Sequence, residues 1–153
     1  MQRKERIKRL RLEDKTILYE VVGGFGWTVP VDKLALLGEY TVPKGPYLDD
    51  HFLIFVIRPN YNWNEATFYC EGREEFLRRT GELLGAGISC GLAGGRAYDS
   101  QVMWPAELKG EKLFDFVPVG SDTFWNRLKN RISRQYNFRY SKAVMRYLDN
   151  DLM

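Results

Sequence analysis

The segment GISCG at residues 87–91 matches the G-x-S-x-G turn that presents the nucleophilic serine of many hydrolases. That turn needs a strand before the serine and a helix after it, and its histidine partner follows later in the chain. Here the preceding residues predict an amphipathic helix, glycines follow, and the only histidine, His51, lies upstream. We therefore predict that Ser89 is no nucleophile and that the glycines form a tight helix exit and a close packing site.

A second group with possible chemistry is Asp49-Asp50-His51. Two carboxylates beside a histidine could perform acid–base catalysis or hold a metal, and on a strand Asp49 and His51 would share a face. However, a single histidine with scattered ligands is a weak metal pattern, and paired aspartates are common where a turn enters a strand. We expect no metal and no cofactor, and a small enzyme centred on these three residues is one alternative.

The two cysteines, Cys70 and Cys90, lie in no metal-site spacing. The chain starts with basic residues and has no apolar segment before Thr16, which argues against a secretory signal. We expect a cytoplasmic location with reduced thiols, at least one of them buried. The longest apolar run, residues 52–57, is too short to cross a bilayer, so no membrane partner is expected.

Charge is distributed unevenly along the chain. Residues 1–12 carry six basic residues and one acid, and residues 121–153 carry seven basic and three acidic residues. Residues 13–120 carry ten basic and sixteen acidic residues, and the net charge is +3. The basic ends could bind a polyanion. Alternatively, they neutralise the acidic middle, within the chain or in a neighbouring subunit.

The C-terminal part has the pattern expected of a nucleic-acid-binding surface. Three arginines follow one flank of a predicted helix, and residues 134–142 interleave basic side chains with aromatic rings that could stack on bases. Alternatively, these rings seal a joint between two helices while the charges stay in water. The candidate nucleic-acid or polyanion-binding residues are Arg127, Arg131, Arg134, Tyr136, Phe138, Arg139 and Lys142.

Aromatic residues in two predicted loops are candidates for contact with a protein partner, because exposed rings of this kind mark interaction sites. Phe25 and Trp27 lie in a glycine loop, and Tyr61 and Trp63 lie in a polar loop at residues 58–65. Alternatively, the four rings fold back as lids on a core rich in aromatic residues.

Hydrophobic periodicity predicts the elements that would position these groups. Strands are expected at residues 16–22, 34–42 and 51–57, the last being central with both faces covered. A short strand or helix lead-in is expected at 67–70. A hairpin is expected from arms at 100–108 and 112–119, with Pro105 placing its first arm at an edge.

The helical pattern begins at Arg73 and ends at Leu84, followed by a glycine stop at Gly85. Two C-terminal helices are expected, the first capped by Ser121 or Asp122 and the second by Ser141. The expected apolar stripes are Phe124, Trp125, Leu128 and Ile132 on the first of these helices, and Val144, Tyr147, Leu148 and Leu152 on the second.

Together these patterns predict an α+β fold, a mainly antiparallel sheet of about five or six strands with one central helix and two C-terminal helices. We expect a single domain, 1–153, with a basic N-terminal arm at 1–12 and a C-terminal helical segment at 121–153. The expected function is non-catalytic binding of a protein partner, or self-association. The alternatives are a nucleic-acid-associated protein that uses its basic N- and C-terminal segments, and the small enzyme described above.

Overall fold

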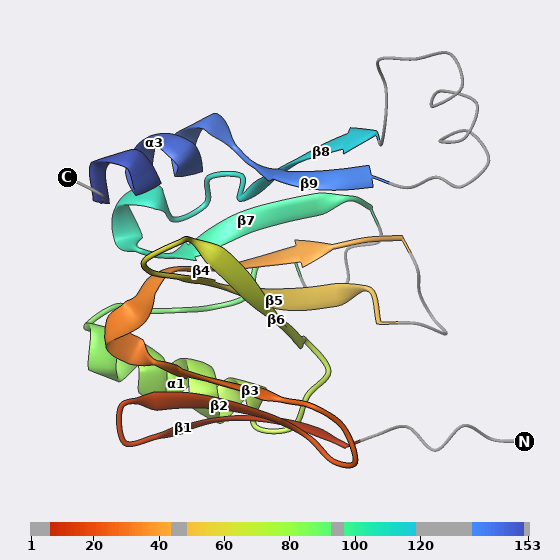
Figure 1. Ribbon diagram of the computed structural model, residues 1–153, viewed down its shortest axis with the longest axis vertical. Helices are drawn as coiled ribbons and strands as arrows, with labels where there is room; N and C mark the ends of the chain where they lie inside the picture. Colours follow the sequence, from red (N-terminus) through yellow and green to blue (C-terminus); the bar gives the residue numbers. More distant parts are fainter. Residues whose placement is uncertain (1–6, 44–48, 93–96, 119–135, 152–153) are drawn as a thin grey trace, which may run out of the picture.

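The computed structural model describes residues 7–43, 49–92, 97–118 and 136–151 (Figure 1). The described chain contains antiparallel sheets of three, four and two strands together with two α-helices, which confirms the α+β class. The expected strand number was too low. The strands are β1 (Lys8–Glu13), β2 (Thr16–Val21), β3 (Trp27–Pro30), β4 (Leu34–Thr41), β5 (His51–Ile57), β6 (Asn62–Thr67), β7 (Asp99–Trp104), β8 (Phe114–Pro118) and β9 (Tyr136–Tyr140), and the helices are α1 (Arg73–Leu84), α3 (Lys142–Asp151) and the short 3-10 turns η1 (Val31–Lys33) and η2 (Ala106–Leu108).

The four-stranded sheet, in the order β6-β5-β4-β7, is the middle layer of the fold (Figure 1). Alternate side chains of β5 enter two different cores, because successive residues of a strand point to opposite faces. Leu53 and Phe55 pack with α1 and the β1-β2-β3 sheet, whereas Ile54 and Val56 pack with β8, β9 and α3. The prediction that this strand is central with both faces covered is confirmed.

Helix α1 has the predicted bounds and packs against β1. Its buried face includes Phe76, Leu77 and Thr80. The helix ends at Gly85, whose φ of +68° lies in the left-handed region that glycine adopts without strain. Leu83, an apolar residue in the last turn of the helix, is 41% exposed. The helix therefore buries a narrower stripe than its sequence suggests.

Two strands, β1 and β6, lie where the sequence analysis expected an arm and a polar loop, and β3 begins at Trp27, which was expected in a glycine loop. The described end of the basic arm forms part of β1, because Leu10 and Leu12 alternate with Arg9 and Arg11, and only the leucines are buried. The segment at residues 58–65, expected to be a polar loop, turns and then forms β6 at an edge of the middle sheet. Both β1 and β6 contain too few apolar residues to be predicted as strands from their composition.

The expected hairpin of residues 100–108 and 112–119 is wrong. Strand β7 pairs with β4, while β8 pairs with β9, so the two arms belong to different sheets. Pro105 follows β7, which is an edge strand as predicted. Residues 136–140, expected to join two helices, form β9 instead. The first C-terminal helix, with its Ser121 or Asp122 cap and its stripe of Phe124, Trp125, Leu128 and Ile132, lies outside the described residues.

The last helix, α3, begins directly after its predicted cap, Ser141, and Leu152 of its predicted stripe lies outside the described residues. The hydroxyl oxygen of Ser141 accepts a hydrogen bond from the Val144 N–H at 3.3 Å, which satisfies one free donor of the first turn. Val144 and Leu148 are buried and Tyr147 is half-buried. Among the residues that the structure describes, no helix has the length and apolar character needed to cross a membrane.

Candidate functional site

The three candidate acid–base residues each bind a different partner. The Lys8 ammonium lies 3.2 Å from the Asp49 carboxylate, and the Tyr69 hydroxyl donates to Asp50. His51 points into the protein and is only 3% exposed. The geometry therefore does not gather these residues into one reactive centre.

His51 belongs instead to a buried polar cluster built by the register of the middle sheet. Glu39, in β4, lies directly opposite Gln101 in β7. In β5, His51 lies opposite Thr41 of β4. Thr41 is two residues along β4 from Glu39, so the side chains of Glu39 and His51 lie on the same face of the sheet. The side chains of Glu39, His51 and Gln101 thus meet on the face that α1 covers.

The Glu39 carboxylate accepts four hydrogen bonds in this cluster. Its Oε1 lies 2.9 Å from His51 Nε2 and 3.0 Å from the Leu92 nitrogen. Its Oε2 lies 2.9 Å from the Gly91 nitrogen and 3.1 Å from Gln101 Nε2. Burial alone would raise the pKa of Glu39, but the hydrogen bonds from His51, Gln101 and the two backbone amides together hold that pKa below its ordinary value. The group is therefore a buried carboxylate that anchors the chain at residues 91 and 92.

Sequence analysis missed Glu39, although one feature of the sequence could have identified it. Every residue of β4 is buried, and Glu39 is the only charged residue in that strand. A buried charge is tolerated only with partners that satisfy it, so an acid inside an apolar strand predicts a hydrogen-bonded cluster. The partners themselves come from distant segments and could not be read from this strand alone.

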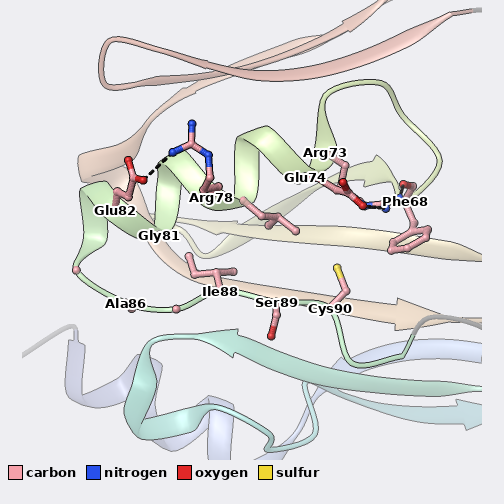
Figure 2. A pocket seen from close by; sticks show the side chains of 13 residues that line it. Phe68, Arg73, Glu74, Arg78, Gly81, Glu82, Ala86, Ile88, Ser89 and Cys90 are labelled. Atoms are coloured by element: carbon pink, nitrogen blue, oxygen red, sulfur yellow. Dashed lines mark hydrogen bonds and ion pairs between the residues drawn. The ribbon is translucent and has the colours of Figure 1, made fainter.

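Ser89 lies where the prediction placed it, beyond the end of α1. Figure 2 shows its side chain pointing away from that helix. Among the described residues no hydrogen bond joins Ser89 to His51, whose Nε2 is bound to Glu39 instead. The arrangement differs from a hydrolase triad at each of these points.

Both cysteines are free thiols, and Cys70 is buried, as predicted. Burial raises the pKa of Cys70 to about 11 and the pKa of Cys90 to about 12. Because the thiolate is the nucleophile and the metal ligand, neither sulfur is prepared for reaction at neutral pH.

A groove of about 780 Å³ separates α1 from the segment that follows it (Figure 2). In residues 87–90 the side chains of Ile88 and Cys90 point toward the helix and Ser89 points the other way, the alternation of an extended chain. Gly81 permits the close exit from α1, because a Cβ at this position would lie 2.6 Å from the Ala86 carbonyl oxygen.

The groove combines an apolar floor with charged rims. Its apolar lining includes Phe68, Leu77 and Ile88. The guanidinium of Arg73 lies 3.7 Å from the centre of the Phe68 ring, close enough for a cation–π contact. Arg78 lies on the rim and is held by ion pairs to two glutamates of α1. These contacts hold two cationic side chains beside the apolar lining of the groove.

The main chain at residues 87–90 offers an open hydrogen-bonding edge. Within the described part of the protein, the N–H and C=O groups of these residues make no hydrogen bond. The next two amides, of Gly91 and Leu92, are bound to Glu39. An extended segment with free donors and acceptors can pair with another extended chain.

Three of the four candidate partner-binding aromatics are folded back onto the protein. Trp27 donates its ring N–H to the Glu65 carbonyl and packs on Phe55. The Tyr61 hydroxyl donates to Asp151. Trp63 packs against the rings of Phe114 and Tyr140. These three side chains act as lids, which is the alternative that the sequence analysis had kept.

Phe25 is the exception, since its side chain is 100% exposed. It lies in the turn between β2 and β3, beside Val22, which is 53% exposed. The Val22 N–H donates to the Ile7 carbonyl, and the Ile7 side chain is 45% exposed. We call Ile7, Val22 and Phe25 the hairpin-tip patch.

Only part of the predicted nucleic-acid surface is described. Arg127, Arg131 and Arg134 lie outside the described residues, and Tyr136 belongs to β9. Phe138 is half-buried and packs against other rings of the second core, including Phe116. Arg139 and Lys142 are exposed. Nucleic-acid binding stays a prediction.

Comparison with known proteins gives no further guidance to the class of this protein. No protein-family model matches the chain. No match emerges among curated proteins or among solved structures.

Proposed function

We propose that this protein is a non-catalytic interaction domain that binds a protein partner in the groove between α1 and residues 87–90. The observation that carries the proposal is the open main-chain edge beside an apolar floor. An extended peptide can hydrogen-bond to such an edge while its side chains enter the pocket, and this mode of recognition recurs in many binding domains.

The chemistry of the surrounding groups supports binding over catalysis. Glu39 and His51 satisfy each other and the backbone, and Asp49 and Asp50 are bound to Lys8 and Tyr69. A general base must be free to reach a substrate proton, and a nucleophile needs such a base beside it. A peptide ligand requires none of these groups, because it uses main-chain hydrogen bonds and apolar contacts.

Photo-crosslinking from inside the groove tests this proposal. A photoreactive amino acid replaces Ile88, which lines the groove, and the variant is irradiated in an extract of the native cell. The matched control carries the same group at Lys109, an exposed position after η2. We expect protein adducts from position 88 and none from position 109. Equal adducts from both positions, or none from position 88, would contradict the proposal.

A further inference from the structure

We infer that the groove binds an extended, uncharged segment of another protein, with apolar side chains at alternate positions. This inference rests on the proposed function and gives its ligand a chemical class. It joins two observations: the charged residues that line the groove are paired with one another, and residues 87–90 form an extended edge beside them.

The charge of Arg78 is balanced by two acids of its own helix. Its guanidinium lies 2.7 Å from the carboxylate of Glu82, which also lines the groove, and 2.7 Å from that of Glu75, which does not. Both acids have the spacing that brings side chains together on a helix surface. A ligand therefore meets a guanidinium that already has two carboxylates, and a Glu82 carboxylate that already has a guanidinium.

Arg73 is occupied in a different way. Its guanidinium lies 3.7 Å from the centre of the Phe68 ring, donates to the Phe68 carbonyl oxygen, and lies 3.5 Å from the Glu74 carboxylate. The His51 ring stacks on Phe68 with 4.0 Å between the ring centres, and it lies on the opposite face because two groups so close to one ring centre cannot share a face. Arg73 thus ends a column of stacked groups, and a ligand would have to displace its existing partners.

This balanced pairing disfavours a charged ligand of either sign. The lining contains two arginines and two glutamates, each with a partner of opposite charge. The Cys90 thiol adds no charge at neutral pH, because burial raises its pKa to about 12. A charged side chain in the groove would lose water and gain no free counter-charge from these residues, which is costly. An apolar side chain would instead gain contact with Phe68, Leu77 and Ile88.

The edge defines the length and the spacing of the ligand. Residues 87–90 span about 13 Å at about 3.3 Å per residue. Helix α1 has 12 residues and is about 18 Å long, so it can cover the whole edge. About four residues of a partner strand can therefore pair with the edge. Every second side chain of that strand points toward α1, as Ile88 and Cys90 do in Figure 2, and only these positions need to be apolar.

Calorimetric titration with three synthetic peptides tests the inference. Each peptide has about six residues, is acetylated at its start and amidated at its end, and alternates serine with valine. In the second and third peptides, aspartate or lysine replaces the central valine. We expect the valine peptide to bind most tightly, and each charge to weaken binding by a factor of about 10 or more. No binding of the valine peptide, equal binding of all three, or tighter binding of either charged peptide would overturn the inference.

The position of the bound valine peptide is measured by amide hydrogen exchange. The amides of residues 87–90 make no hydrogen bond within the described part of the free protein, so the peptide should slow their exchange. Ile88→Ser should weaken binding several-fold because it removes part of the apolar lining. The control Met145→Ser removes an exposed apolar side chain of α3 and should leave binding unchanged. Slower exchange confined to another segment would overturn the groove as the site.

Removal of the lining acids tests the physical reason for the preference. In the double variant Glu74→Gln and Glu82→Gln, Glu75 is the one acid of the described chain that still binds either arginine. The aspartate peptide should bind this variant about three to ten times more tightly than it binds the wild type. The control pair Glu107→Gln and Glu111→Gln removes two exposed acids outside the lining and should change no affinity. An unchanged preference in the first variant would contradict the charge argument.

The two proposals fail in different ways. If position 88 gives protein adducts in the extract while a charged peptide binds as tightly as the valine peptide or more tightly, the groove binds a partner of another chemistry and only this inference is wrong. If the valine peptide binds and protects residues 87–90 while position 88 gives no adduct in the extract, the ligand chemistry is supported and the proposed function is contradicted.

Discussion

Replacing Glu39 with Gln tests whether this one carboxylate anchors residues 91 and 92, in the glycine-rich segment 87–92 after α1, to the middle sheet. The change keeps the size and shape of the side chain and removes its charge. It also converts one acceptor oxygen into an NH2 group, which can only donate. In the wild-type protein four donors converge on the Glu39 carboxylate, so a neutral amide in its place cannot satisfy all of them.

The expected loss in the free energy of unfolding follows from these four contacts. If the amide oxygen replaces Oε1, its NH2 faces the Gly91 N–H, and if it replaces Oε2, its NH2 faces the Leu92 N–H. Gln101 can rotate its amide and His51 can change its tautomer, but a backbone N–H cannot adapt. One unsatisfied donor costs about 1–3 kcal/mol, and the remaining bonds weaken because they lose their ionic character. We expect a total loss of about 3 kcal/mol in the free energy of unfolding.

Urea unfolding of Glu39→Gln and of the control Glu111→Gln measures this loss. Glu111 is exposed, so its neutralisation should change the free energy of unfolding by less than about 0.5 kcal/mol. Amide hydrogen exchange adds a local readout, because Gly91 and Leu92 should exchange much faster in the Glu39 variant. A loss no larger than in the control, with unchanged exchange at both amides, would refute the anchoring role.

The pH dependence of the same variant has a defined sign. Because the folded state holds the pKa of Glu39 below its ordinary value, ionised Glu39 stabilises the fold at neutral pH. That contribution is lost as the pH falls through the lowered pKa. The difference in stability between the wild type and Glu39→Gln should therefore shrink in acid. A difference that stays constant from neutral pH into acid would contradict this reasoning.

The remaining predictions concern the end of α3 and the thiols. Arg58 donates two hydrogen bonds to Asp151, at 2.7 and 2.8 Å, so Asp151→Asn should cost about 1 kcal/mol in urea unfolding, a small value because the pair is partly exposed. These hydrogen bonds hold the pKa of Asp151 below its ordinary value, so the loss should disappear as the pH falls through that pKa. Cys70 and Cys90 should react slowly with a thiol reagent in the native protein, and both should react rapidly in denaturant. If no thiol reacts in denaturant, the two cysteines form a disulfide and the prediction is wrong.

The sequence predicts β5 and α1 at their observed bounds because both signals are local. A run of six apolar residues is typical of an interior strand, and an apolar stripe that ends at a glycine indicates a helix and its stop. The edge position of β7 follows from Pro105 for a similar reason. These features need no knowledge of what the chain packs against.

The missed features depend on contacts between distant segments. Strand β1 is half arginine and lysine, so its two buried leucines carry the only sign of a strand. The pairing of β7 with β4, rather than with β8, decides that Gln101 lies opposite Glu39. The candidate site could not be foreseen for the same reason. Its walls are α1 and residues 87–90. The position of residues 87–90 depends on the Glu39 carboxylate of β4, which binds the next two amides along the chain.

The glycine-rich segment at residues 87–92 shows that a sequence motif typical of a catalytic serine can instead have a structural role. Backbone N–H groups in such a segment could hold a ligand's negative charge, but at Gly91 and Leu92 those groups are occupied by Glu39 of the same chain. A substituent at Gly91 would also collide with the Gln101 side chain, whose nitrogen would lie 2.4 Å from the added Cβ. Anchoring one end of the segment in this way holds residues 87–90 extended and at a fixed distance from α1. The carboxylate is fully buried and cannot touch a partner. Any influence of Glu39 on binding in the groove must therefore pass through the position of this segment.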